Sequence, residues 1–440
     1  MNTAIIGAGA SGLSLALMLD GDVTIFEQSD RTGGHCHATI RDGWTFDRGP
    51  HIMFSRDKDV LDFMIASLGD NVHQSRRNNR VFVEGRMVKY PLENDLASLT
   101  LEARSRCLLD YLFNDQSRLA ENPSNLDEWF VGNFGEGMTD LYFRPYNEKI
   151  WNVALRDLSM SWSERIPSPP PEDVVKGALG VVTEGYLHQL NYHYPLVGGY
   201  QAITDAWTEL VPRGFLRLDT TVRSVVKRDH GVDVTTNTGT EHFDRVVSTA
   251  PMVSLLTMVD HVPASIRDAV ASLRVNPIDV ITLGYRGTDR NKFTAVYFAD
   301  DSYLPNRVSS PSVFSPRNAP DGCFSLQAEI TFPPGNDYLK IADEALITHV
   351  HEGFVSSGLV EPDSEPIFRD VQRLEFAYVV YTKGYEDSVA LVREWAQSAG
   401  VTIHGRFGSF DYLNVDGCVR RSQELASELN RRLTPLPSVA

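Results

Sequence analysis

The sequence predicts an α/β fold: a Rossmann-type dinucleotide-binding domain with a helical insert and a substrate domain built on a mixed or antiparallel β-sheet. The first observation is an apolar run that opens into GxGxxG, Ala4-Ile5-Ile6-Gly7-Ala8-Gly9-Ala10-Ser11-Gly12. The second is Glu27, which ends the next apolar run. The third is helical periodicity over residues 95–165, which stops at Pro167-Ser168-Pro169-Pro170-Pro171.

The glycines of the first motif have separate tasks. Gly7 permits a tight turn, and Gly9 lets the backbone approach a pyrophosphate. Gly12 lets the next helix, expected from Ser11 to Leu19, pack on its strand. Glu27 stands where a carboxylate accepts hydrogen bonds from the ribose of an adenine dinucleotide. A lone GxGxxG is weak evidence, but strand, turn, helix, strand and acid in this order predict a dinucleotide site.

A second glycine pair favours FAD over NAD. Arg31-Thr32-Gly33-Gly34 follows Glu27, so that Gly33 and Gly34 extend the phosphate cradle. NAD-binding domains usually lack this pair, whereas FAD enzymes of the glutathione-reductase and amine-oxidase types carry it. The adjacent His35-Cys36-His37 suggests a metal site, but no second group of ligands accompanies it, so we expect a flavin loop and no metal.

Composition and charge exclude several classes of function. The 440 residues are enough for two or three domains, and 42% of them are hydrophobic. A net charge of −17 argues against a nucleic-acid or anionic-membrane surface, so an anionic ligand must meet local arginines. With no basic leader and no apolar run of transmembrane length, we expect a cytoplasmic protein without membrane insertion. A homo-oligomer stays open, and the separated cysteines are expected to be buried free thiols: Cys36, Cys107, Cys323 and Cys418.

The later segments predict a discontinuous domain plan. Tyr194-Pro195-Leu196-Val197-Gly198-Gly199 begins a new unit. Periodicity then predicts a helix over 202–210, strands over 222–227, 231–236 and 245–248, a second sheet from alternation at 280–285 and 324–329, and a last helix over 419–432. We therefore assign residues 1–72, 197–256 and 398–440 to the FAD-binding domain, 95–194 to a helical substrate domain, and 73–94 with 257–397 to a mixed-sheet domain.

Five blocks along nearly the whole chain resemble the UDP-galactopyranose mutase family, and its eukaryotic type more than its bacterial one. They are Asp47-Arg48-Gly49-Pro50-His51-Ile52-Met53-Phe54-Ser55, Arg144-Pro145-Tyr146-Asn147-Glu148-Lys149-Ile150-Trp151, Trp162-Ser163-Glu164-Arg165, residues 195–199, and Gly405-Arg406-Phe407-Gly408-Ser409-Phe410-Asp411-Tyr412. The RPYNxKxW and GRFG blocks are the specific ones. The glycine motifs are shared with the wider amine-oxidase-like flavoproteins.

The resemblance implies a diphosphate site. An acidic protein can hold a diphosphate only with guanidinium forks and hydroxyl donors gathered in one cleft. Arg165 and Arg307 match the two diphosphate-binding arginines of the family. The other positions that match its phosphate and sugar contacts are Tyr297, Tyr378, Tyr412, Asn147, Trp151 and, in the tail after the GRFG block, Asp416.

The resemblance also implies how the flavin is held. His51 matches the histidine beside the flavin, on a loop with Gly49 and Pro50. The C-terminal segment would return to the flavin through Arg406, Phe407 and Gly408. Val222, at the start of a predicted strand, is a further expected cofactor contact.

The implied activity is that of an isomerase. A nucleotide-sugar mutase interconverts the pyranose and furanose forms of its substrate through an adduct between N5 of reduced flavin and the sugar, with no net redox. His51, Arg165 and Arg307 are the implied catalytic residues. NADPH or NADH would reduce the FAD in the same cleft, because the sequence has no second dinucleotide motif.

The segment Tyr90-Pro91-Leu92-Glu93 departs from the family pattern of an aromatic residue and a glutamine near the uracil. Leu92 cannot stack as an aromatic ring does, and an ionised Glu93 can only accept hydrogen bonds. Guanine presents two adjacent N–H groups that a carboxylate can accept, so Glu93 points to GDP. UDP and dTDP stay open, as do solvent exposure of Glu93 or its pairing with an arginine.

Two rival functions share the FAD motifs. An amine-oxidase-like oxidase or desaturase would need an apolar substrate tunnel, which the arginine and tyrosine set opposes. A catalytically silent FAD-binding protein is conceivable because of Leu92 and Glu93, but His51, Arg165 and Arg307 argue for an enzyme.

Overall fold

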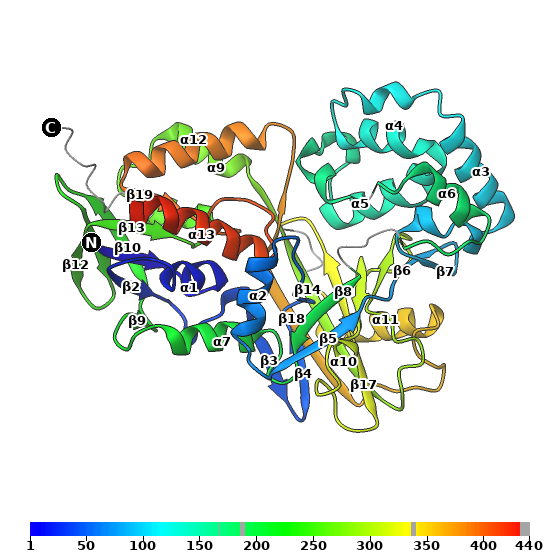
Figure 1. Cartoon of the computed structure of the whole chain (residues 1–440), viewed down its shortest axis with the longest axis horizontal. Helices are drawn as coiled ribbons and strands as arrows, with labels where there is room; N and C mark the ends of the chain where they lie inside the picture. The colour runs from blue at the N-terminus through cyan, green and yellow to red at the C-terminus, as the bar shows by residue number, and fades with distance from the viewer. Residues whose placement is uncertain (167, 185–189, 336–339, 432–440) are drawn as a thin grey trace.

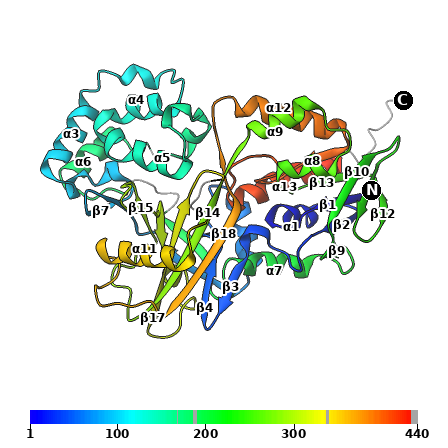
Figure 2. The ribbon, with the colours of Figure 1, turned by 180° about the vertical axis from the view of Figure 1, so that it is seen from behind.

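The computed structural model describes residues 1–166, 168–184, 190–335 and 340–431, without the side chains of Glu164 and Arg165. Its elements form three groups: a parallel sheet covered by helices, a helical group, and a large mixed sheet (Figure 1). The reverse view shows the same three groups next to one another (Figure 2). The predicted α/β class, with a helical insert and a mixed sheet, is confirmed.

The parallel sheet has the strand order β19-β13-β1-β2-β9. Its strands are β1 (Asn2–Ile6), β2 (Asp22–Phe26), β9 (Leu216–Arg217), β13 (Arg245–Ser248) and β19 (Val401–Ile403). Successive side chains of a strand point to opposite faces. Ile5 therefore packs with α1 (Ala10–Ala16), α7 (Gln201–Leu210) and α13 (Val415–Arg431), whereas Ala4 and Ile6 pack with the cluster on the other face.

Three smaller antiparallel sheets accompany the two large ones in the described residues. They consist of β10 (Val222–Lys227), β11 (Val232–Thr236) and β12 (Thr240–Phe243); of β3 (Ala38–Arg41) and β4 (Trp44–Asp47); and of β5 (Val72–Arg76) and β8 (Asn191–Pro195). The predicted strands 222–227 and 245–248 have these same bounds. The first helix stops at Ala16 rather than Leu19, and the last one begins at Val415 rather than Val419.

The mixed sheet has seven strands in the order β18-β14-β17-β16-β15-β6-β7. They are β6 (Asn79–Val83), β7 (Arg86–Lys89), β14 (Arg274–Arg286), β15 (Ala295–Phe298), β16 (Arg307–Ser309), β17 (Cys323–Thr331) and β18 (Phe368–Val380). Only the β15–β6 pair among the described pairings of this sheet is parallel. One face packs against α11 (Asp343–Ser356), and the other meets the helical group.

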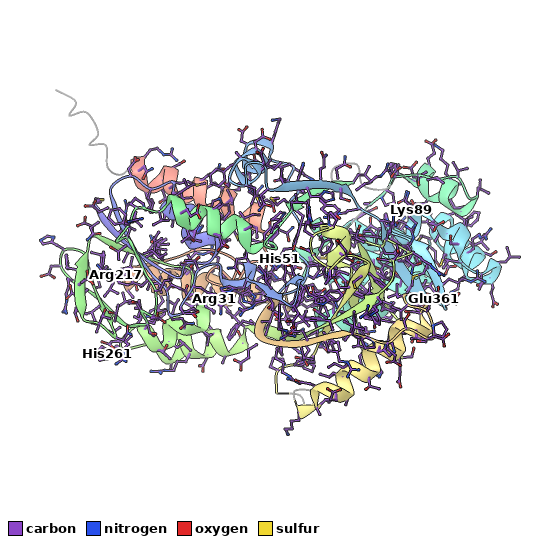
Figure 3. The ribbon with its side chains drawn as sticks, turned by 90° about the horizontal axis from the view of Figure 1, so that it is seen from below. Arg31, His51, Lys89, Arg217, His261 and Glu361 are labelled. Carbon is purple, nitrogen blue, oxygen red and sulfur yellow. The ribbon has the colours of Figure 1, made fainter. Side chains whose placement is uncertain are left out.

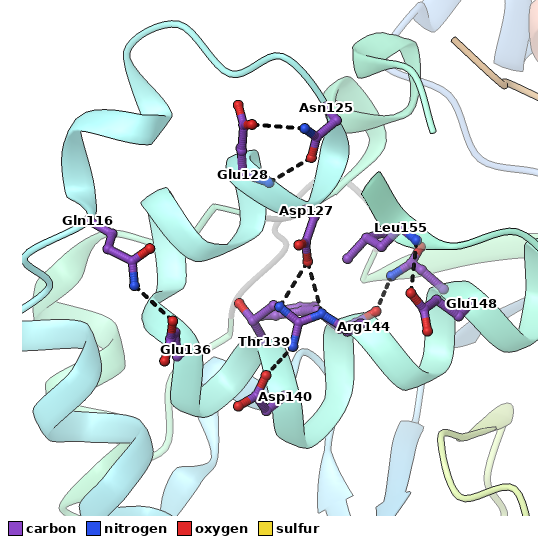
Figure 4. Close-up of polar contacts among 12 residues, drawn as sticks. Gln116, Asn125, Asp127, Glu128, Glu136, Thr139, Asp140, Arg144, Glu148 and Leu155 are labelled. Atoms are coloured by element: carbon purple, nitrogen blue, oxygen red, sulfur yellow. Dashed lines mark hydrogen bonds and ion pairs between the residues drawn. The ribbon is translucent and has the colours of Figure 1, made fainter. Parts of the chain in front are cut away.

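The helical group contains α3 (Leu101–Leu112), α4 (Leu126–Met138), a π-helical turn (Thr139–Phe143), α5 (Arg144–Trp151) and α6 (Pro171–Ala178). Asn125 caps α4 by accepting from the amide of Glu128, whose carboxylate accepts from the Asn125 side chain (Figure 4). Arg144 of α5 forms ion pairs with Asp127 of α4 and with Asp140 of the π-helical turn. These contacts fix the helix that carries the RPYN block.

Two helices differ from the predicted domain plan. α9 (Ala264–Ser272) and α12 (Tyr385–Ser398), assigned from sequence to the mixed-sheet domain, pack with Val246 and Val401 of the parallel sheet, together with α8 (Leu255–Met258). We propose that the FAD-binding domain includes them. The remaining α-helices of the described residues are α2 (Lys58–Ala66) and α10 (Pro311–Phe314). In the described part of the chain, no helix has the length and apolar character needed to span a membrane.

Candidate functional site

A cavity of about 1060 Å³ lies where the three groups of elements meet. It begins at the glycine turn after β1, passes His51 and Arg307, and continues to Glu93 beside the helical group. His51 lies near the middle of the molecule, between Arg31 and Lys89 in the view of Figure 3. The cavity therefore joins the predicted dinucleotide site to the predicted substrate residues.

Two glycine motifs form the dinucleotide end of the cavity. Gly7 and Gly33 have φ angles of 100° and 107°, which favour glycine. Gly9 and Gly33 form a β-bridge, and a Cβ on Gly34 would come within 3.3 Å of the Gly9 Cα atom. Bare backbone thus lines this part of the cavity, as close approach to a pyrophosphate requires.

Glu27 is held at the edge of this cradle. Its carboxylate accepts from the amide of Ala8 at 2.8 Å and from the amide of Ser29 at 3.0 Å. A carboxylate has about four lone-pair positions, so it can still accept from ribose hydroxyls on the cavity side. The residues present fit the adenosine diphosphate half of FAD.

The C-terminal segment meets the opposite wall. Arg406 donates to the carbonyls of Leu413 and Ala377, both at 3.0 Å, while its buried Nε has no hydrogen-bond partner among the described residues. Phe407 packs on the His35 ring, with centroids 4.7 Å apart. Burial lowers the pKa of His35 to about 3, helped by Arg406, so this ring is neutral at pH 7. The free N–H of the Arg406 guanidinium could donate to an electron-rich group of the cofactor.

His51 follows the Gly49-Pro50 turn at the centre of the cavity. Its Nδ1 donates to the Gly49 carbonyl at 2.9 Å in the neutral tautomer. Burial lowers the pKa of His51 to about 4, and Arg406 and Arg307 add to the effect. His51 is therefore neutral at pH 7 and supplies no positive charge.

Arg307 supplies that charge. It forms an ion pair with Glu329 of β17 and donates to the Tyr378 hydroxyl at 3.3 Å. Burial opposes its charge, but Glu329 and the adjacent tyrosines raise the pKa of Arg307 well above the usual value. The Glu329 carboxylate also lies beside the loop of Gly49, Pro50 and His51, because a Cβ on Gly49 would come within 2.9 Å of its Oε1 atom.

A group of tyrosines surrounds Arg307. Tyr297 is its register partner between β15 and β16, and its ring lies 4.9 Å from Tyr90 and 5.6 Å from Tyr146. The ring of Tyr378 lies 5.8 Å from that of Tyr412. Burial raises the pKa of Tyr378 well above its usual value, so its hydroxyl stays protonated and can donate.

Most predicted residues line this one cavity. They are Gly7, Gly9, Ser11, Glu27, Gly33, Gly34, Gly49, Pro50, His51, Tyr90, Glu93, Asn147, Val222, Tyr297, Arg307, Tyr378, Arg406, Phe407, Tyr412 and Asp416. Gly12 and Gly408 lie behind it, in tight contact with main chain. The side chain of Arg165 lies outside the described residues.

Two predicted substrate residues do not reach the cavity. Leu92 is fully buried in the core of the helical group, and Trp151 is buried against Trp162 and Tyr378. A short helical turn and a helix end aim these side chains into the core, so we propose packing roles for both. Glu93 is fully buried, so it does not point to solvent. Its carboxylate oxygens have no hydrogen-bond partner among the described residues, so it is not paired with one of their arginines.

Sequence reasoning missed Glu329, Tyr146 and Asn79, which also line the cavity. Glu329 stands in a strand that is buried on both faces. A carboxylate in such a strand is costly unless it has a partner, so its place among apolar residues was the signal that could have identified it. The four cysteines are free; three are buried and Cys323 is half-buried. Within the described residues no three His, Cys, Asp or Glu side chains are grouped to hold a metal ion.

A family model for flavin-containing amine oxidoreductases matches residues 10–355. The chain belongs to this family. It is therefore a flavoprotein that binds FAD, as the two glycine motifs predict.

Solved structures give the fold a more specific likeness. A reduced UDP-galactopyranose mutase is 26% identical and superposes with a TM-score of 0.89 over 99% of this chain and 96% of that one. A putative protoporphyrinogen oxidase from Exiguobacterium, 19% identical with a TM-score of 0.75, covers 98% and 99% and shares the fold.

Curated relatives match shorter stretches. Mitochondrial protoporphyrinogen oxidase of Nicotiana tabacum is 24% identical over 298 residues, which are 58% of this chain and 59% of that protein. A 4,4'-diapophytoene desaturase of Staphylococcus aureus is 43% identical over 66 residues, 14% of this chain and 13% of that one. The matches thus span at most about three fifths of these two proteins.

Proposed function

We propose that the protein is a flavin-dependent nucleotide-sugar mutase, an isomerase that interconverts pyranose and furanose forms without net redox. One observation carries the proposal: the dinucleotide cradle, the His51 loop and the Arg307 anion site share one cavity. The 26% identity to a mutase over nearly the whole chain supports it.

The chain's own residues would bind and stabilise the departing diphosphate. Arg307 keeps its charge because Glu329 compensates it. The Tyr378 hydroxyl, which accepts from Arg307, would donate its own proton to the diphosphate from the same side. Charge-assisted hydrogen bonds in a partly dry site favour the anion that forms as the glycosidic bond breaks. Arg165 is the proposed second cation.

Bound, reduced FAD would supply the nucleophile for the anomeric carbon, and NADPH or NADH is the proposed reductant. His51 is neutral, so it orients the adjacent loop through its bond to Gly49 and does not compete with Arg307 for the anion. Tyr297 and Asn147 would position the sugar and diphosphate from the two walls of the cavity.

We expect turnover to require reduced flavin without consuming reductant in proportion to product. The FAD-loaded protein would be reduced without oxygen and given UDP-, GDP- and dTDP-sugars in turn. Sugar products would be separated by chromatography while NADPH is followed by absorbance. Many products per NADPH support a mutase.

Other results would contradict the mutase assignment. One NADPH consumed per product, or oxidation of an apolar amine or polyene with no isomerisation, would establish an oxidoreductase. Absence of turnover with every nucleotide sugar, by a protein that carries reducible FAD, would refute the mutase assignment.

A further inference from the structure

Glu93 is a buried carboxyl group that the proposed chemistry does not use. It lines the cavity with its side chain fully buried, and neither carboxylate oxygen has a hydrogen-bond partner in the described part of the chain. Burying a carboxyl group without a partner is costly, so a fixed pair of empty acceptor positions indicates a ligand that donates hydrogen bonds.

The turn that carries Glu93 cannot rotate this group out to solvent. Leu92 and Asn94 on either side of it are buried. α6 packs tightly against the turn, since a Cβ on Gly177 would come within 2.6 Å of the Asn94 carbonyl. Asn94 is further fixed by a 2.5 Å hydrogen bond to Thr183. Glu93 therefore keeps its place in the wall of the cavity.

A second empty acceptor lies in the same cavity. Asn79 donates through Nδ2 to the Tyr297 hydroxyl at 3.3 Å, which leaves its buried Oδ1 without a partner among the described residues. Tyr297 also contacts Tyr90, three residues before Glu93, and is paired in register with Arg307. This chain of contacts leads from the anion site to Glu93.

We propose that Glu93 recognises the base of the nucleotide sugar and that this base is guanine. The proposal rests on the proposed function, because a nucleoside diphosphate held at Arg307 brings a base into the cavity. Guanine presents N1–H and N2–H side by side, so two carboxylate oxygens can accept both. Uracil and thymine place one N–H between two carbonyls, one of which would face an ionised Glu93.

The ionisation of Glu93 makes the expected base preference depend on pH. Burial raises the pKa of Glu93 to about 8 in the free protein. The titratable groups that sense its charge are Tyr111 of α3 and Tyr142 of the π-helical turn, and burial with Glu93 raises both of their pKa values. Neither tyrosine titrates below pH 8. Between pH 6 and 8, guanine binding must therefore ionise Glu93.

The expected pH dependence follows from this ionisation. Guanine prefers the carboxylate, so GDP affinity gains by up to about tenfold per pH unit from pH 6 to 8 and levels off above the free-state pKa. A neutral Glu93 offers one donor and one acceptor, which would suit uracil and give the opposite slope. Protonation of the diphosphate affects the dissociation constants of UDP and GDP equally, so it cancels in their ratio.

The experiment is calorimetric binding of GDP, UDP and dTDP to the oxidised, FAD-loaded protein at pH 6, 7 and 8. We expect GDP to bind roughly tenfold or more tightly than UDP at pH 8, with the ratio rising with pH. In Glu93→Gln the amide nitrogen would face guanine N–H groups. The preference for GDP should fall at least about tenfold and lose its pH dependence.

Glu121→Gln is the matched control, because Glu121 is exposed on the same helical group, and its binding should equal that of the wild type. Flavin content and absorbance establish that both variants fold. Tighter wild-type binding of UDP or dTDP, or a GDP preference that Glu93→Gln leaves unchanged, overturns the assignment. Turnover of UDP-sugars without GDP preference refutes this inference alone, whereas GDP preference without turnover refutes only the mutase.

Discussion

Gly12→Ala is expected to prevent stable retention of FAD. A Cβ at this position would lie 2.0 Å from the carbonyl oxygen of Gly7 and 3.3 Å from Cγ2 of Ile5. The first contact is with main chain at the turn that receives the pyrophosphate, so the turn must open. Overpacking of this kind costs about 3 kcal/mol, which corresponds to a loss of roughly a hundredfold or more in FAD affinity.

Flavin absorbance of the purified variant and its titration with added FAD measure this loss. Gly353→Ala is the matched control: it lies within α11, where the new Cβ would meet the Tyr303 ring at an ordinary 3.5 Å. Far-ultraviolet circular dichroism separates a damaged cradle from a protein that fails to fold. Wild-type affinity in a folded Gly12→Ala protein would show that helix and turn do not need this contact.

The dinucleotide half could be predicted because its signals are local. A strand, a glycine turn, a helix and Glu27 follow one another within 27 residues, and each position has a fixed steric task. The strands β10 and β13 were predicted from the sequence with the bounds that the structure has. Local pattern therefore determines both the class of the fold and its cofactor.

The substrate half depends on contacts that periodicity does not encode. Leu92 and Glu93 are neighbours in one short turn, yet one enters the core and the other the cavity. Likewise, α9 and α12 pack on the parallel sheet because the chain returns to this sheet after the segments that form the other two groups. Side-chain direction in irregular segments and long-range packing need the tertiary structure.

Glu329 illustrates a signal that was present in the sequence. Gln327 and Glu329 alternate with apolar residues in β17, although both faces of this strand are buried. Gln327 donates to the Asp47 carbonyl at 2.9 Å, and Glu329 pairs with Arg307. Polar residues at alternate positions of a fully buried strand indicate a polar cavity on one side.

Arg307→Ala is expected to lower kcat/KM about a hundredfold with FAD retained. The lost charge-assisted contacts to the diphosphate should cost roughly 3 kcal/mol of transition-state stabilisation. Steady-state kinetics with the preferred nucleotide sugar and the flavin spectrum measure the two properties. Arg290→Ala removes an arginine from an exposed pair with Glu361 and should leave both unchanged.

A loss of activity in Arg307→Ala has two origins that must be separated. The Glu329 side chain is only 3% exposed, so without Arg307 its charge is buried unpaired, which typically costs about 3 kcal/mol of folding stability. Glu329→Gln removes that charge and leaves Arg307 in place. The double variant Arg307→Ala/Glu329→Gln therefore has neither charge, and its stability should recover most of the loss.

The kinetics of the double variant decide the role of Arg307. If Arg307 binds the diphosphate, kcat/KM stays about a hundredfold low although stability recovers, because no cation replaces the guanidinium. Glu329→Gln alone should cost less, about tenfold, since the guanidinium keeps its charge but loses the partner that holds it beside Tyr378. Recovery of activity together with stability would instead mean that Arg307 serves only to compensate Glu329, and the diphosphate site would have to lie elsewhere.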